Sequence, residues 1–175
     1  MTLHRRARYS KIEAMVEALL DQHGQQEPPV RIERITKGLG VEIRSGDLGD
    51  VSGMIVRSGE GAIIGVNSTQ VRQRQRFTIA HELGHFLLHE DLVNHVDHNY
   101  RINYRSAESS LATNVDEIEA NFFAASILMP KQFLDDLHAY EALDSDTEVA
   151  SLAKQFDVSR HAMSLRLANL YQAPY

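Results

Sequence analysis

The pentapeptide His81-Glu82-Leu83-Gly84-His85 is the strongest chemical signal in the sequence. Two histidines four residues apart on a helix lie on one face, so both imidazole rings can reach one metal ion. Glu82 lies near the same face, where its carboxylate can act as a general base. Zinc held at such a site supplies Lewis acidity and lowers the pKa of its water to about 7. The motif therefore predicts hydrolysis of a peptide bond, with His81 and His85 as ligands and Glu82 as the base.

A catalytic zinc ion needs a third protein ligand, and residues 116–129 contain two candidates. Glu117 and Glu119 stand two residues apart, about 200° around a helix, so only one of them can face the metal. Asn121 follows Glu117 by four residues on the same face, where it can hydrogen-bond a liganding histidine. We therefore favour Glu117 and expect Glu119 to be a solvated surface charge, while Glu119 stays the alternative ligand.

Several other side chains are weaker candidates for the site. His89 continues the histidine spacing by another turn, but it lies too far along the helix axis, and its position suits the helix dipole. The polar stretch 91–110 lacks clear periodicity and is predicted to be a long loop with short extended pieces. Its side chains are expected to be ordinary surface or packing groups, although one of four could donate a hydrogen bond to a tetrahedral intermediate: His95, His98, Tyr100 or Tyr104.

Two buried helices must position the site. Residues 72–89 contain no proline, and their apolar side chains make an almost continuous surface, which predicts a substantially buried helix. A second buried helix is predicted for residues 116–129, where Pro130 halts it. Gly84 lies inside the first helix, although a mid-helix glycine costs about 1 kcal/mol relative to alanine. It indicates either close approach by another chain or a simple helix–helix contact.

The chain before the motif predicts a small antiparallel sheet. Residues 41–44 alternate like a strand, and residues 52–56 and 62–67 are predicted to be strands around a glycine-containing turn. We expect this sheet to pack on the motif helix. The hairpin could offer an edge strand to an extended peptide through main-chain hydrogen bonds, although its apolar residues could equally pack the sheet.

Helices are predicted at both ends of the chain. Near the N-terminus, Ser10 and Glu13 can form a capping box for an amphipathic helix. Residues 131–175 form a mainly helical C-terminal part, in which two short helices surround Asp157-Val158-Ser159 like a helix-turn-helix. Three cations of this part could face the phosphates of DNA: Arg160, His161 and Arg166.

Composition and charge limit the class of protein. With 175 residues, 43% of them hydrophobic and 24% charged, the chain fits one soluble globular domain. The lack of cysteine removes disulfide scaffolds and thiolate metal sites, so a metal must use His, Asp or Glu. A net charge of −6 gives no general attraction to nucleic acid, and the sequence has neither a signal peptide nor a membrane-spanning apolar run. We therefore expect a cytoplasmic protein without membrane or direct DNA contacts.

Two other function classes compete with hydrolysis. A DNA-binding regulator would use the helix-turn-helix-like pattern, but the acidic balance and the lack of a basic cluster in its second helix argue against it. A protein-interaction module could keep the metal for structure alone. Glu82 argues against this second hypothesis, because structural zinc sites are closed and need no base.

Two segments carry a family resemblance: RFTIAHELGHFLLH at residues 76–89 and EIEANFFAASILMP at residues 117–130. Together they resemble the ImmA/IrrE metallo-endopeptidases, and the similarity extends over most of the chain. The resemblance implies that Glu117 is the third zinc ligand, in agreement with the helical-face argument. It also implies a bacterial or phage-related endopeptidase that cleaves a helix-turn-helix repressor of stress-response or mobile-element genes.

These expectations combine into one α+β, zincin-like metallopeptidase domain over residues 1–175. Its expected zinc ligands are His81, His85 and Glu117, and Glu82 is the expected catalytic base. Two histidines and a glutamate suit zinc best, although affinity order and availability in the cell decide between zinc, manganese and iron. The expected partner is a protein substrate.

Overall fold

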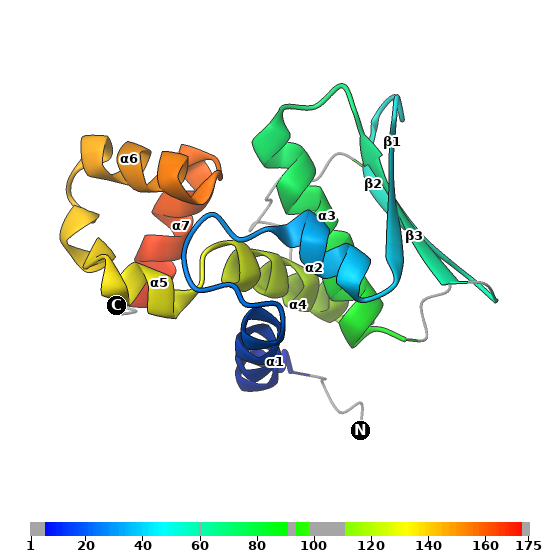
Figure 1. Ribbon diagram of the computed structural model, residues 1–175, viewed down its shortest axis with the longest axis horizontal. Helices are drawn as coiled ribbons and strands as arrows, with labels where there is room; N and C mark the ends of the chain where they lie inside the picture. Colours follow the sequence, from blue (N-terminus) through cyan, green and yellow to red (C-terminus); the bar gives the residue numbers. More distant parts are fainter. Residues whose placement is uncertain (1–5, 60, 91–93, 99–110, 173–175) are drawn as a thin grey trace.

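The computed structural model describes residues 6–59, 61–90, 94–98 and 111–172 (Figure 1). Its elements, in chain order, are α1 (Tyr9–Gln22), α2 (Ile32–Gly38), β1 (Val41–Gly46), β2 (Val51–Ser58), β3 (Gly61–Asn67), α3 (Arg72–Leu88), β4 (Asn94–His98), α4 (Leu111–Leu128), α5 (Lys131–Asp136), η1 (Ala139–Ala142), α6 (Asp146–Phe156) and α7 (Arg160–Tyr171). The predicted α+β class is confirmed, because helices occur together with a four-stranded sheet. Tyr100 and Tyr104 lie outside the described residues. Within those ranges, none of the helices combines the length and apolar character needed to cross a membrane.

The sheet is mixed, so the prediction of an antiparallel sheet is only partly right. Its strand order is β1-β3-β2-β4, with β2 antiparallel to both neighbours and β1 parallel to β3. Ile64 of β3 lies between Ile43 of β1 and Ile55 of β2. The β2–β3 hairpin therefore places β3 between two strands that are neighbours in the sequence. Alternating apolar residues indicate strands, but they carry no information about this order.

The hairpin does not offer β2 as an edge strand, contrary to the sequence prediction. Met54 of β2 pairs with Gly65 on one side and with Val96 of β4 on the other. The edges of the sheet are β1 and β4. β4 lies in the stretch that was predicted to be a loop with short extended pieces, and it completes the sheet beside the motif helix.

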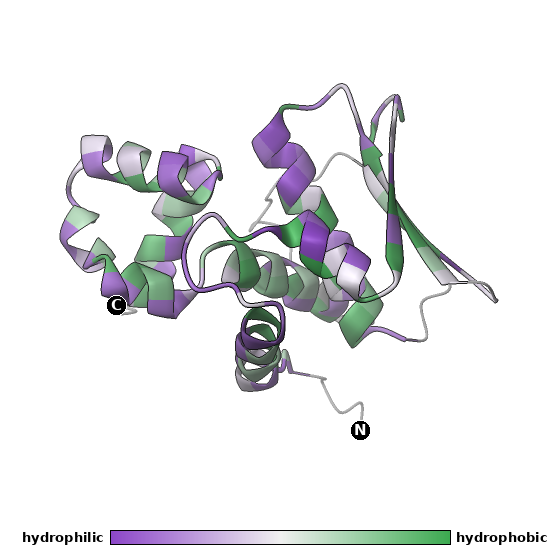
Figure 2. Cartoon of the chain, in the orientation of Figure 1, coloured by the Kyte–Doolittle hydropathy of each residue, from purple (hydrophilic) through white to green (hydrophobic). Residues whose placement is uncertain are grey.

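The motif helix α3 lies between the sheet and α4 (Figure 1). Every residue from 78 to 85 is buried, which confirms the predicted burial of this helix. On the sheet side, β2 passes so closely that a Cβ on Gly53 would lie 2.2 Å from the Thr78 side chain. On the far side, α4 is predominantly apolar (Figure 2) and also packs against α1. The helix that carries the motif is therefore held from two sides.

Gly84 marks the contact between α3 and α4. A Cβ at this position would lie 3.1 Å from the Ala120 Cα and from a Phe123 ring atom, and 3.2 Å from the Ala120 carbonyl oxygen. Because two of these atoms belong to the backbone of a packed helix, they cannot move aside cheaply. Of the two interpretations of this glycine, the structure favours the helix–helix contact.

Replacing Gly84 by alanine is expected to lower the free energy of unfolding by about 1–3 kcal/mol, because the added methyl group pushes α3 and α4 apart. Helix propensity alone would predict a gain of about 1 kcal/mol. Urea denaturation measures the difference, and Gly59→Ala is the control because its Cβ would meet open space in the β2–β3 turn. A Gly84→Ala protein as stable as the parent would contradict the proposed tightness of this contact.

The helices at the two ends differ from the predictions in detail. α1 begins at Tyr9 with Arg8 as its N-cap and no side-chain cap hydrogen bond, so the predicted capping box of Ser10 and Glu13 is wrong. At the other end, α6 and α7 surround Asp157, as the helix-turn-helix-like pattern predicted. Arg166 is buried, however, and donates to the Met129 carbonyl oxygen at 3.1 Å. It is therefore not available to DNA phosphates.

Candidate metal centre

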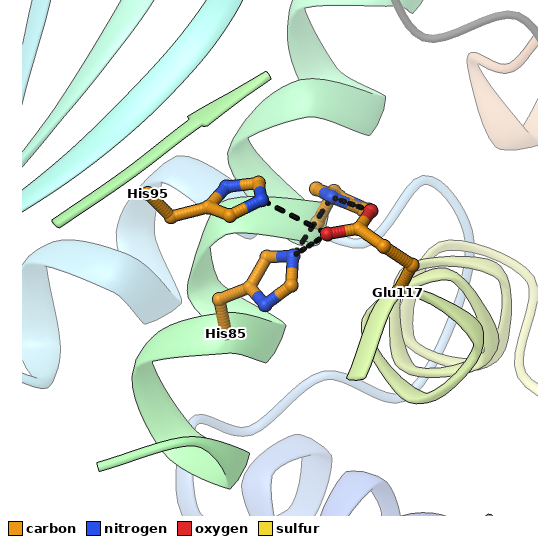
Figure 3. A group of neighbouring side chains, drawn as sticks. His85, His95 and Glu117 are labelled. Atoms are coloured by element: carbon orange, nitrogen blue, oxygen red, sulfur yellow. Dashed lines mark hydrogen bonds and ion pairs between the residues drawn. The ribbon is translucent and has the colours of Figure 1, made fainter. Parts of the chain in front are cut away.

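Three elements converge on one group of polar side chains. α3 contributes His81 and His85, β4 contributes His95, and α4 contributes Glu117 (Figure 3). One nitrogen of each histidine and one carboxylate oxygen lie within 4.8 Å of one another. The structure thus brings together the three residues that the sequence singled out as ligands, and it adds His95.

The distances within this group fit a metal ion. His81 Nε2 and His85 Nε2 are 3.1 Å apart. The two oxygens of Glu117 lie 3.2 Å from His85 Nε2 and 3.4 Å from His81 Nε2. With zinc–ligand bonds of about 2.0–2.2 Å, the donors of a tetrahedral site are expected to lie about 3.3–3.5 Å apart. Two imidazoles and a carboxylate at this spacing are a suitable donor set for zinc.

An amide from α4 fixes the tautomer of His81. The Asn121 Oδ1 atom is an acceptor, so the Nδ1–H group of His81 donates to it, at 2.9 Å. The Nε2 atom of His81 is thereby turned inward, toward the Nε2 of His85. Asn121 is the partner that its spacing from Glu117 predicted.

A chain of polar groups fixes His85 in the same way. His89 Nε2 donates to Glu119 Oε2 at 3.1 Å, so His89 Nδ1 can accept from the Nδ1–H of His85 at 3.0 Å. Asp116 also approaches His89 Nε2, at 3.3 Å. Glu119 in turn accepts from the backbone and the guanidinium group of Arg8, at 2.6–2.9 Å. The Nε2 atom of His85 is left to face the metal position with a lone pair.

This series of contacts overturns the sequence prediction for Glu119 and adds a contact to the interpretation of His89. Glu119 is fully buried and ion-paired, and is not a solvated surface charge. Its partner Arg8 precedes it by 111 residues in the sequence, and helical spacing cannot predict a contact between residues so far apart. His89 is also buried, and it orients His85 through a side-chain contact, which the helix-dipole interpretation did not foresee.

Two arginines hold the end of α3 that carries these histidines. One Nη2 atom of Arg57 on β2 donates to the carbonyl oxygens of His85, Phe86 and His89, at 2.7–3.2 Å. Arg8 donates to the Leu88 carbonyl oxygen at 3.1 Å. The last carbonyl groups of a helix have no partner within it, so these contacts fix the helix end.

Electrostatics at the centre suit metal binding. Burial lowers the pKa of His85 to about 4, so its ring is neutral at neutral pH. Burial alone would raise the pKa of Glu117, but hydrogen bonds with His81, His85 and His95 hold it well below its usual range. Metal ligands must be deprotonated, and both groups meet this requirement.

Glu82 is fully buried, and its partner is His95. His95 Nδ1 lies 3.1 and 3.4 Å from the two Glu82 oxygens, and His95 Nε2 lies 2.9 Å from Glu117 Oε1. Burial lowers the pKa of His95, but its hydrogen bonds with both carboxylates outweigh burial and raise the pKa to about 10. The expectation of an ordinary loop or surface residue is therefore wrong. His95 reaches the site through strand pairing of β4 with β2, which no spacing from the motif could indicate.

A family model described as the IrrE N-terminal-like domain matches residues 36–168, which include all four side chains of the centre. The chain belongs to this family. The resemblance to ImmA/IrrE proteins that the two motif segments indicated is therefore confirmed.

Two curated relatives of this IrrE N-terminal-like domain are named radiation response metalloprotease IrrE. The protein from Deinococcus deserti is 33% identical over 117 residues, which cover 66% of this chain and 39% of that protein. The protein from Deinococcus radiodurans is 33% identical over 102 residues, which cover 57% of this chain and 29% of that protein. The chain thus matches well under half the length of these relatives.

A solved structure also resembles the IrrE N-terminal-like domain of this chain. It is described as a Mycobacterium tuberculosis transcriptional regulator, and it superposes with a TM-score of 0.61 over 94% of this chain and 48% of its own. The sequence identity is 17%, so this likeness shows a common fold alone.

Proposed function

We propose that this chain is a zinc-dependent endopeptidase, with His81, His85 and Glu117 as metal ligands and Glu82 as the general base. The observation that carries the proposal is a buried carboxylate, Glu82, beside donors that converge at metal-ligand distances. A site that held metal for structure alone would have no need of this base. The names of the two Deinococcus relatives support the same activity.

Each residue then has a defined role. A bound zinc ion supplies Lewis acidity and lowers the pKa of a coordinated water to about 7. Glu82 accepts a proton at its carboxylate and later returns it to the leaving amine. Asn121 and His89 keep the rings of His81 and His85 turned inward, so that both Nε2 lone pairs stay available.

For the substrate we propose a protein, specifically a helix-turn-helix repressor that controls stress-response or mobile-element genes. This proposal rests on the family resemblance. A cytoplasmic location and a single zincin-like domain over residues 1–175 belong to the same proposal. Co-incubation of the purified protein with candidate repressors, followed by mass spectrometry of the products, would identify the cleaved bond.

Metal content is the measurement that tests the centre itself. Purified parent protein, grown without added metal, is expected to carry about one zinc ion per chain. His85→Ala is expected to carry none, because it removes a buried donor whose Nε2 lies 3.1 Å from that of His81. If the parent stayed metal-free even after zinc titration, the motif would be a packing feature and the proposed activity would fail.

A further inference from the structure

The three histidines of the centre share one arrangement, which the proposed ligand set does not explain for His95. Each turns Nε2 inward and uses Nδ1 for an outer partner: His81 for Asn121, His85 for His89, and His95 for Glu82. A histidine that ligates a metal typically donates its other N–H to a carboxylate, a carbonyl or a water. His95 satisfies this pattern, since its outer partner is a carboxylate.

The inner face of His95 points at the same group of donors. Its Nε2 lies 2.9 Å from Glu117 Oε1, the oxygen that lies 3.2 Å from His85 Nε2 (Figure 3). One ligand atom from each of the four residues His81, His85, His95 and Glu117 lies within 4.8 Å of the others, so His95 Nε2 is placed among the proposed ligand atoms.

We propose that His95 is a fourth protein ligand, which closes the metal centre in the arrangement described here. The inference rests on the proposed metal site and adds a residue to it. Four protein ligands leave no open position, and catalytic zinc needs one. With zinc bound, His95 would therefore have to move away from the metal position before substrate could react, and this movement would also release Glu82 from its contact with His95 Nδ1.

The position of His95 in the fold is compatible with such a departure. It lies on β4, an edge strand whose sheet partner is β2. The pairing has a register irregularity between Val51 and Gly53. The other two histidines lie inside α3, which is packed from two sides. Among the four donors, His95 thus belongs to the element with the least support.

Zinc affinity measured by chelator competition tests the assignment with four full-length proteins. Relative to the parent, His95→Ala and His95→Gln are both expected to bind zinc more weakly by more than about 100-fold, beyond the roughly 10–100-fold that losing an outer partner costs. Glutamine keeps an N–H donor for the carboxylates but is a poor zinc ligand, so it separates ligation from hydrogen bonding. Val96→Ala is the control and should match the parent, because Val96 is on the same strand, exposed, and points to the opposite face.

Cobalt(II) substitution provides a readout that is independent of turnover. The visible spectrum of the cobalt-loaded parent should not change when acetohydroxamate is added, because the centre has no open position. The spectra of cobalt-loaded His95→Ala and His95→Gln should change. Parent-like zinc affinity in His95→Gln, or an equal response to acetohydroxamate in parent and variants, would overturn the ligand assignment. Zinc binding that is unaffected by His85→Ala would instead defeat the proposed metal site itself.

Discussion

Replacing Glu82 by glutamine is expected to lower the rate of peptide cleavage by at least about 100-fold, the contribution that a general base commonly makes. Metal content and fold should be unchanged. Glutamine has nearly the same size as the fully buried glutamate, and its amide oxygen can still accept from His95 Nδ1. The substitution therefore removes the ability to take up a proton and little else.

Three measurements on Glu82→Gln separate chemistry from structure. These are the cleavage rate on a repressor substrate, zinc content by mass spectrometry, and the midpoint of thermal unfolding. Glu90→Gln is the matched control, since Glu90 follows α3 and is exposed. Parent-like cleavage by Glu82→Gln would refute its assignment as the base.

Glu117→Ala is expected to lose mainly zinc affinity, whereas Glu119→Ala is expected to lose mainly stability. Removal of Glu117 deletes a carboxylate that lies within 3.4 Å of both α3 histidines, so zinc affinity should fall by more than about 100-fold, beyond the effect of losing an outer partner. Removal of Glu119 should lower zinc affinity by only about 10–100-fold, through the loss of support for His89.

Stability should show the reverse order. Glu119 is fully buried and accepts three hydrogen bonds from Arg8, which is itself partly exposed. Its loss is expected to cost the metal-free protein about 2 kcal/mol. Glu117 is partly exposed, and its loss should cost less. Chelator competition measures the zinc affinity of the two variants, and urea denaturation measures their stability. If Glu119→Ala lost zinc more completely than Glu117→Ala, the ligand role would pass to Glu119.

The parts of the site that lie on one helix could be predicted from the sequence, because helical geometry repeats every 3.6 residues. This periodicity placed His81, His85 and Glu82 together, and the spacing between Glu117 and Asn121 indicated the face of α4 that meets the two histidines. The burial of both helices followed from their apolar side chains.

The parts that depend on tertiary contacts could not be predicted. His95 reaches the centre through a strand pair, and Arg8 reaches Glu119 from 111 residues away. The order of strands in the sheet is a similar case, since no local sequence pattern indicates that β3 lies between β1 and β2. Local spacing cannot register contacts that form only when distant segments pack.

The contacts of Arg8 with Glu119 lie partly outside the segment that the family model matches. The family model matches residues 36–168, whereas Arg8 and α1 precede residue 36. A polypeptide trimmed to residues 36–168 would leave Glu119 without Arg8, and would expose the face of α4 that α1 covers. The support for the metal centre therefore includes residues that lie outside the segment matched by the family model.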